Sequence, residues 1–285
     1  MAEKKKKPKK LRLLIQGGFA ALSNGYLLGF GKGKIYTGPL KVLCHPGMNC
    51  YSCPGALGAC PIGALQAFAT GREYRVALYV FGLLTVLGTL LGRLICGFFC
   101  PFGWIQDLLH KIPFPKKLRR LPGEKALRLL RYGMLIFFVF LFPALLHDAF
   151  GFGDPWFCKY LCPVGTLEAG IPLVLANGHF QGAIGGLFFW KLAVLLVILF
   201  LSVLLYRPFC RYLCPLGALY GFFNRFAVYR FSIDTASCLQ CGACQRACKL
   251  DIPVWQKPNS VDCIRCGECR HACPVGAIKT TLRKK

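Results

Sequence analysis

Hydrophobic residues in this chain gather in four stretches that are separated by polar segments. These stretches cover residues 13–30, 76–95, 132–146 and 187–206, and each contains few charged side chains. A helix of about 20 mainly apolar residues can cross the hydrocarbon core of a bilayer, and the third stretch reaches this length with its flanks. We therefore expect an all-α polytopic membrane bundle of about four transmembrane helices over residues 13–230.

Basic residues mark one side of this expected bundle. Residues 1–12 hold seven Lys and Arg, and residues 111–131 hold eight against a single acidic residue. Four crossings put both blocks and the C-terminus on the same side, which the excess of Lys and Arg identifies as cytoplasmic. We predict a multi-pass protein of the cytoplasmic (inner) membrane with a basic cytoplasmic tail at 1–12 and both termini in the cytoplasm.

The formal net charge of +25 is itself ambiguous, since nucleic-acid-binding proteins are also basic. Here 55% of the residues are hydrophobic, and the charges lie in blocks beside the apolar stretches. Such blocks are typical signals of membrane topology. We expect membrane lipid as a partner and no nucleic acid.

The C-terminal residues 231–285 carry two Cys-x2-Cys-x2-Cys-x3-Cys runs, which are typical of bacterial two-cluster ferredoxins. The fourth Cys of each run ligates the other cluster. One [4Fe–4S] cluster is therefore assigned to Cys238, Cys241, Cys244 and Cys273, and the second to Cys263, Cys266, Cys269 and Cys248. We expect an α+β two-cluster ferredoxin domain. A pair of zinc knuckles is the alternative, although zinc sites usually combine two Cys-x2-Cys pairs across a longer loop.

The expected membrane part contains the other ten of the 18 cysteines, and a Cys-Pro-x-Gly motif recurs in it four times. The motifs begin at Cys60, Cys100, Cys162 and Cys214, and three of them have a second Cys four residues earlier, namely Cys96, Cys158 and Cys210. A short apolar stretch follows each motif, so we expect re-entrant or interfacial helices. Irregular backbone at membrane depth is tolerated where protein buries it, as around a metal cluster.

The expected topology sorts these cysteines into two levels. An inner membrane cluster is predicted on Cys96, Cys100, Cys210 and Cys214, and an outer one on Cys53, Cys60, Cys158 and Cys162, with Cys50 or Cys44 as substitutes. Together with the ferredoxin domain this predicts four [4Fe–4S] clusters, with iron held by the same Cys residues. The alternative is that Cys-x3-Cys-Pro is a packing or redox-disulfide motif.

The Cys-Pro-Ile-Gly motif after Tyr51-Ser52-Cys53-Pro54, the Cys-x3-Cys-Pro repeats and the double ferredoxin run resemble the NapH/NosR/CcoG group of membrane-bound polyferredoxins. The resemblance covers nearly the whole chain beyond the basic tail, and the NapH-type branch matches best in length and layout. It implies electron transfer between the quinone pool and redox partners, as a membrane subunit of a respiratory chain.

We therefore expect an iron–sulfur subunit that passes single electrons between the quinone pool, or an extracytoplasmic redox partner, and the cytoplasmic ferredoxin domain. It would belong to a hetero-oligomeric, quinol dehydrogenase-like oxidoreductase, with a soluble ferredoxin, flavoprotein or cytochrome as partner. No catalytic residue is assigned. The alternative is an assembly or regulatory protein that uses clusters for maturation or sensing of a respiratory metalloenzyme. Asp148, Asp154 and Glu168 could accept protons from a quinol, or could serve only loop solubility.

Overall fold

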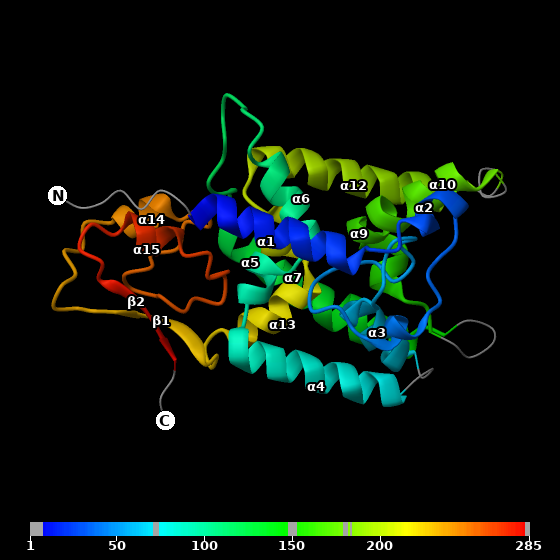
Figure 1. The fold of residues 1–285 in the computed structure, drawn as a ribbon, viewed down its shortest axis with the longest axis horizontal. Coiled ribbons are helices and arrows are strands. Elements are labelled where there is room, and N and C mark those ends of the chain that lie inside the picture. The colour runs from blue at the N-terminus through cyan, green and yellow to red at the C-terminus, as the bar shows by residue number, and fades with distance from the viewer. Residues whose placement is uncertain (1–7, 71–73, 148–152, 179–181, 183, 283–285) are drawn as a thin grey trace.

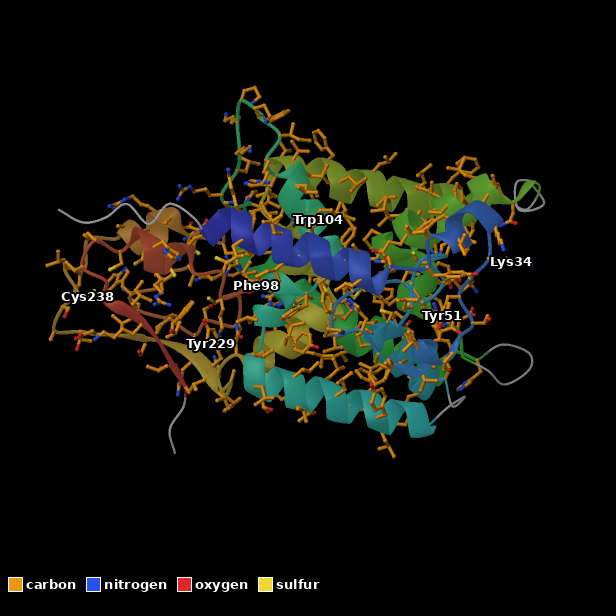
Figure 2. The ribbon with its side chains drawn as sticks, in the orientation of Figure 1. Lys34, Tyr51, Phe98, Trp104, Tyr229 and Cys238 are labelled. Carbon is orange, nitrogen blue, oxygen red and sulfur yellow. The ribbon has the colours of Figure 1, made fainter. Side chains whose placement is uncertain are left out.

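The computed structural model describes residues 8–70, 74–147, 153–178, 182 and 184–282. A helical body makes up most of the molecule, and the ferredoxin unit lies at one end of it (Figure 1). Cys238 lies at this ferredoxin end, whereas Lys34 and Tyr51 lie at the opposite end (Figure 2). The start of the first helix and the end of the last strand both lie at the ferredoxin end (Figure 1).

Long helices run along the body in alternating directions (Figure 1). They are α1 (Pro8–Ser23), α4 (Tyr74–Leu91), the continuous run of α7 (Glu124–Gly133), η2 (Met134–Leu141) and α8 (Phe142–Leu145), and α12 (Gly186–Leu204). α1 and the α7–α8 run lead away from the ferredoxin end, while α4 and α12 lead towards it. Successive long helices therefore run in opposite directions, and they pack mainly against the short helices of the body.

Within the described residues, two helices are long and apolar enough to cross a membrane, Glu124–Leu145 and Gly186–Leu204. α4 contributes a shorter apolar helix, Leu78–Leu91. The predicted span 13–30 is not one helix, because α1 ends at Ser23 and a separate helix α2 (Leu28–Lys32) follows. Asn24 and Gly25 separate them, and both residue types favour breaks in helices. Two of the four expected spans thus have the required length.

The N-terminal boundary also differs from the expected basic tail at 1–12. Residues 1–7 lie outside the described part of the chain, and residues 8–12 form the first turns of α1. Arg12 is buried, and its guanidinium lies 2.9 Å from the Asp107 carboxylate. The end of the predicted tail therefore belongs to the folded body.

Short helices fill the body between the long ones. They are η1 (Pro39–Val42), α3 (Pro61–Ala69), α5 (Leu94–Phe98), α6 (Pro101–Leu109), η3 (Phe157–Leu161), α9 (Pro163–Gly165), η4 (Thr166–Gly170), α10 (Ile171–Ala176), η5 (Phe209–Leu213) and α13 (Pro215–Phe223). Each Cys-Pro motif starts one of these helices, with its Cys as the N-cap and its Pro at the first helical position. Proline suits this position because the helix needs no N–H there.

Two of the short helices, η3 and η5, are single π-helical segments over the related sequences Phe-Cys-Lys-Tyr-Leu and Phe-Cys-Arg-Tyr-Leu. Each ends directly before the Cys of a Cys-Pro motif. π-helical segments are rare and frequently occur at functional sites. The repeated motif is thus matched by a repeated local structure.

The ferredoxin unit is α+β, as expected. Strand β1 (Tyr229–Ile233) pairs antiparallel with β2 (Ile278–Leu282), with Phe231 opposite Thr280. The helices α14 (Ala243–Ala247) and α15 (Glu268–Ala272) contain the third Cys of each run. Gly242 and Gly267 precede these helices with φ of +69° and +79°, a conformation that glycine adopts without steric cost.

The segment 261–265 fastens the ferredoxin unit to the helical body. The Asp262 carboxylate accepts hydrogen bonds from Arg131 (2.5 Å), Arg128 (2.5 Å) and Arg93 (3.4 Å). Burial alone would raise the pKa of Asp262, but these arginines lower it below its usual value. A Cβ on Gly97 would come within 2.5 Å of the Ile264 carbonyl, so the two parts are in close backbone contact.

Candidate metal centres

The four thiols of the predicted inner site lie together in the half of the body nearer the ferredoxin. Cys96 belongs to α5 and Cys210 to η5, while Cys100 and Cys214 cap α6 and α13. All four are buried. Cys210, Cys96 and Cys100 all lie near the Cys214 thiol. A cluster of four buried thiols can be held as thiolates by a cationic iron centre.

Backbone amides of the motif helices point at these sulfurs. The N–H of Gly103 donates to Cys100 Sγ (3.4 Å), and that of Gly217 donates to Cys214 Sγ (3.3 Å). Donors at a helix N-terminus favour negative charge. The Cys-Pro-x-Gly motif therefore places a thiolate ligand at the positive end of its own helix.

Two buried glutamines form equivalent hydrogen bonds in the two halves of the body. Gln106 accepts from the Phe209 N–H (3.2 Å) and donates to Cys210 Sγ (3.2 Å). Gln66 accepts from the Phe157 N–H (3.0 Å) and donates to Cys158 Sγ (3.0 Å).

Our sequence analysis did not identify these glutamines. Their signal is present in the chain, because each stands six residues after the Cys of its motif, in Cys60-Pro-Ile-Gly-Ala-Leu-Gln66 and Cys100-Pro-Phe-Gly-Trp-Ile-Gln106. Hydrogen bonds to cluster ligands tune iron–sulfur sites, so both glutamines belong to the candidate centres.

The outer thiols gather further from the ferredoxin. Cys162 is buried, and Cys158, Cys50 and Cys60 lie near its thiol. The Cys50 N–H donates to Glu168 Oε2 (2.7 Å). A Cβ on Gly165, in the motif of Cys162, would lie 3.7 Å from Cys50 Sγ.

Cys53 and Cys44 have other surroundings. The Cys53 thiol lies 3.6 Å from Asn24 Oδ1. Cys44 forms a backbone bridge with Ala59, and its thiol donates to the Ala59 carbonyl (3.5 Å). Of the three cysteines considered for the fourth position, Cys50 is thus the one beside both thiols of the 158/162 pair.

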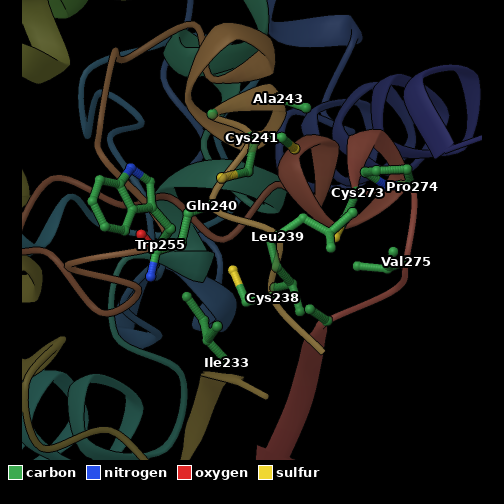
Figure 3. Close-up of a pocket in the computed structure, with 14 residues that line it drawn as sticks. Ile233, Cys238, Leu239, Gln240, Cys241, Ala243, Trp255, Cys273, Pro274 and Val275 are labelled. Atoms are coloured by element: carbon green, nitrogen blue, oxygen red, sulfur yellow. The ribbon is translucent and has the colours of Figure 1, made fainter. Parts of the chain in front are cut away.

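The first predicted ferredoxin set lines one pocket. Cys238, Cys241, Cys244 and Cys273 all face it, together with apolar residues that include Trp255 (Figure 3). Cys241 is exposed to solvent. A four-iron cluster is held at separate corners, so a pocket walled by four thiols suits it.

The second ferredoxin set is also brought together. Burial raises the pKa of Cys269, and Cys263, Cys266 and Cys248 raise it further. Within the described part of the chain, no group of three or more His, Cys, Asp or Glu side chains has the geometry to hold a single metal ion.

Buried positive charge near the thiol sets shows whether these sites suit anionic clusters. Among the arginines whose side chains the structure describes, six are buried, namely Arg12, Arg93, Arg131, Arg207, Arg211 and Arg265. Across the described residues, the Nε atoms of five of them are buried without a hydrogen-bond partner, namely those of Arg12, Arg93, Arg131, Arg211 and Arg265. Buried cations need compensating negative charge. A [4Fe–4S] cluster with four thiolates carries about −2, so clusters beside these arginines fit the charge balance.

The acidic residues considered as proton acceptors have local partners. Asp154 forms an ion pair with Lys159 (2.5 Å), and Glu168 accepts from the Cys50 N–H. Asp148 lies outside the described residues. A role for these carboxylates with a quinol stays a prediction.

Comparisons with known proteins agree with the iron–sulfur interpretation. The family Fer4_5, described as a 4Fe-4S binding domain, matches residues 76–122, 130–171 and 187–233. Each of these segments contains one Cys-x3-Cys-Pro pair. A second 4Fe-4S binding domain family, Fer4, matches residues 258–279. Several 4Fe-4S binding domains are thus present, which confirms the expectation of several [4Fe–4S] clusters.

Three relatives illustrate the similarity. An uncharacterized protein of Methanocaldococcus jannaschii, MJ0749, is 29% identical over 70% of this chain and 69% of its own length. The methylamine utilization ferredoxin-type protein MauN of Paracoccus denitrificans is 31% identical over 68% of this chain and 62% of its own. The ferredoxin-type protein NapH of Escherichia coli is 29% identical over 66% of this chain and 59% of its own length.

No solved structure matches the chain. The repeated family matches cover the three segments that supply the Cys-x3-Cys-Pro pairs, and two of these three relatives, MauN and NapH, are named as ferredoxin-type proteins. The chain is thus similar to the NapH-type group of 4Fe-4S ferredoxin-type proteins, and it carries several 4Fe-4S binding domains.

Proposed function

We propose that this protein is a membrane-bound electron-transfer subunit that connects the outer face of the membrane with a cytoplasmic ferredoxin unit. The supporting observation is that four thiol sets follow one another through the molecule. The backbone N–H of Met48 is directed at the Cys100 thiol of the inner set. The backbone N–H of the next residue, Asn49, is directed at the Cys60 thiol of the outer set. The two sets are therefore neighbours across a single peptide unit.

The inner set is in turn joined to the ferredoxin unit. Arg207 donates to the Cys96 carbonyl (2.5 Å). Its positive charge is also close enough to Cys266, in the second ferredoxin set, to favour the thiolate form of that cysteine. The first ferredoxin set lies farthest out, where Cys241 is exposed. This order supports a path of four sites from the outer half of the body to the surface of the ferredoxin.

When bound, the [4Fe–4S] clusters supply one-electron redox chemistry. The chain's own residues hold and insulate them. Cysteine thiolates ligate iron, and the amides of Gln66, Gln106 and the motif glycines donate to sulfur. Fully buried apolar side chains such as Ile62, Phe102 and Phe209 keep water away from the sites. We assign the outer site to Cys50, Cys60, Cys158 and Cys162.

The proposal includes partners at both ends of this path. A quinol or an extracytoplasmic redox protein would exchange electrons at the outer set. A soluble ferredoxin, flavoprotein or cytochrome would dock at the exposed edge around Cys241 and Leu239. The relatives NapH and MauN are named as ferredoxin-type proteins, which supports a place in a larger redox complex.

Protein purified without oxygen should contain about sixteen iron atoms and sixteen acid-labile sulfides per chain, because four thiolate sets each hold four of both. Chemical iron and sulfide assays on the full chain give this number. About eight iron atoms would leave only the ferredoxin sites and would contradict the proposed path. Stoichiometric zinc with no sulfide would support the zinc alternative instead.

A reporter that is active only outside the cytoplasm should stay silent when it is fused after Lys285. The reason is that the basic block at 111–131 lies at the same end of the molecule as the ferredoxin unit, and such blocks remain cytoplasmic. The matched control is the same reporter inserted after Gly178, at the opposite end, where it should be active. The reverse pattern would place the ferredoxin outside the cell membrane.

A further inference from the structure

Two arginines occupy equivalent positions beside the inner thiol set. Arg93 stands three residues before Cys96, and Arg207 stands three residues before Cys210. Their side chains cross over, since Arg93 donates to the Cys210 carbonyl (2.7 Å) and Arg207 donates to the Cys96 carbonyl (2.5 Å). The exposed fractions are 2% for Arg93 and 0% for Arg207. Each half of the inner site is therefore bound by the cation of the other half.

Arg207 is held in this place against its backbone preference. Its φ is +53°, in the left-handed region that residues with a side chain rarely adopt. The Asp107 carboxylate fixes the guanidinium through Nε (2.8 Å) and a terminal nitrogen (2.7 Å). A strained conformation that is anchored so firmly points to a role for the charge it positions.

The carboxylates around these arginines do not cancel their charge. Asp107 is shared between Arg207 and Arg12, and Asp262 is shared between Arg93, Arg128 and Arg131. Glu268 also lies 4.0 Å from Arg12, and Glu124 lies 2.6 Å from Arg128. These five arginines face four carboxylates, so a net positive charge remains beside the inner thiol set.

The outer thiol set has fewer cations at the corresponding places. Pro155 stands three residues before Cys158, where the inner set has an arginine. The Cys158 carbonyl accepts from Lys191 (3.2 Å), as the Cys210 carbonyl accepts from Arg93. The glutamine contacts are the same in both sets, but their charged neighbours differ. The inner set has two crossing arginines, whereas the outer set has Lys191, Lys41 near Cys50, and Glu168 at the Cys50 N–H.

Building on the proposed function, we propose that Arg93 and Arg207 are positioning residues that raise the reduction potential of the inner site above that of the outer site. A site that gains an electron becomes more negative, so a fixed neighbouring cation stabilises its reduced form. The effect is strong here because buried charges interact through a low dielectric. The inner site would therefore hold an electron more tightly than the outer site.

The test is a redox titration of the anaerobically purified full chain, followed by electron paramagnetic resonance. The signal that disappears in Cys210→Ser identifies the inner site, and the signal that disappears in Cys60→Ser identifies the outer site. We expect Arg207→Gln to lower the inner reduction equilibrium constant about tenfold, which is about 59 mV for one electron. Arg207→Lys, which keeps the charge, should stay near the wild-type potential.

Asp107→Asn gives an independent test with the opposite sign, because it removes the anion that opposes Arg207. We expect it to raise the inner potential. Mere disturbance of the fold would not move the two variants in opposite directions. Lys191→Gln is the matched control, and it should lower the potential of the outer signal and leave the inner signal in place.

Unchanged inner potentials in both Arg207→Gln and Asp107→Asn would overturn the inference. If Arg207→Gln loses the inner iron, the inner potentials of Arg93→Gln and Asp107→Asn are compared with that of the wild type instead. The inference then requires a lower potential in Arg93→Gln and a higher one in Asp107→Asn, and unchanged potentials in both overturn it. If the unmodified protein lacks any signal that depends on Cys210, the proposed function fails, and this result differs from a signal that is present but unshifted.

Discussion

Replacing Cys210 by alanine should remove one cluster and stop electron passage between an outer donor and the ferredoxin unit. Cys210 is buried among Cys96, Cys100 and Cys214, and it receives the Gln106 hydrogen bond. The substitution removes one of the four thiolate ligands proposed for the inner site. The expected loss is about four iron atoms per chain.

Two measurements check this result in the same preparation. Iron content should fall by about a quarter, while the spectra of the ferredoxin sites stay intact, because their ligands all lie between Cys238 and Cys273. The rate at which a reduced quinol analogue reduces the ferredoxin sites should drop to the background rate. A variant that keeps the normal rate would show that electrons enter at the cytoplasmic face, without passing the inner site.

Cys50→Ala should remove the outer cluster, whereas Cys53→Ala should retain it. The two cysteines are three residues apart in one loop, so they are a matched pair. The Cys50 thiol lies near Cys162, as do Cys60 and Cys158, whereas the Cys53 thiol lies beside the Asn24 side chain. We expect a loss of about four iron atoms for Cys50→Ala and none for Cys53→Ala.

Iron and sulfide assays on both variants, with the outer paramagnetic signal as a second readout, compare the two positions directly. Cys44→Ala serves as a further control, since its thiol donates to the Ala59 carbonyl. Loss of the outer signal in Cys53→Ala together with its retention in Cys50→Ala would reverse the assignment.

The ferredoxin sets are predictable because their chemistry is local. Both Cys runs lie within 36 residues, and the rule that the fourth Cys ligates the other cluster assigns all eight ligands without any knowledge of the fold. The structure brings the same two sets together. The inner set required only one more step, because the Cys-x3-Cys-Pro repeat and the expected direction of each helix place Cys96/Cys100 and Cys210/Cys214 at one level.

The sequence by itself therefore predicted the class of the protein and the ferredoxin ligand sets from short-range spacing, and it predicted the pairing of the membrane cysteines from spacing together with the expected helix directions. Only the tertiary structure showed that Cys50 lies beside Cys162, that Gln106 donates to Cys210 and that Arg207 donates to the Cys96 carbonyl. It also decided that α1 ends at Ser23 and that Arg12 is buried. The physical reason is distance along the chain. These contacts join segments about 100 residues apart, and their geometry depends on how buried helices pack. Motif spacing singles out a recurring residue such as Gln106, but it does not name the distant partner of that residue.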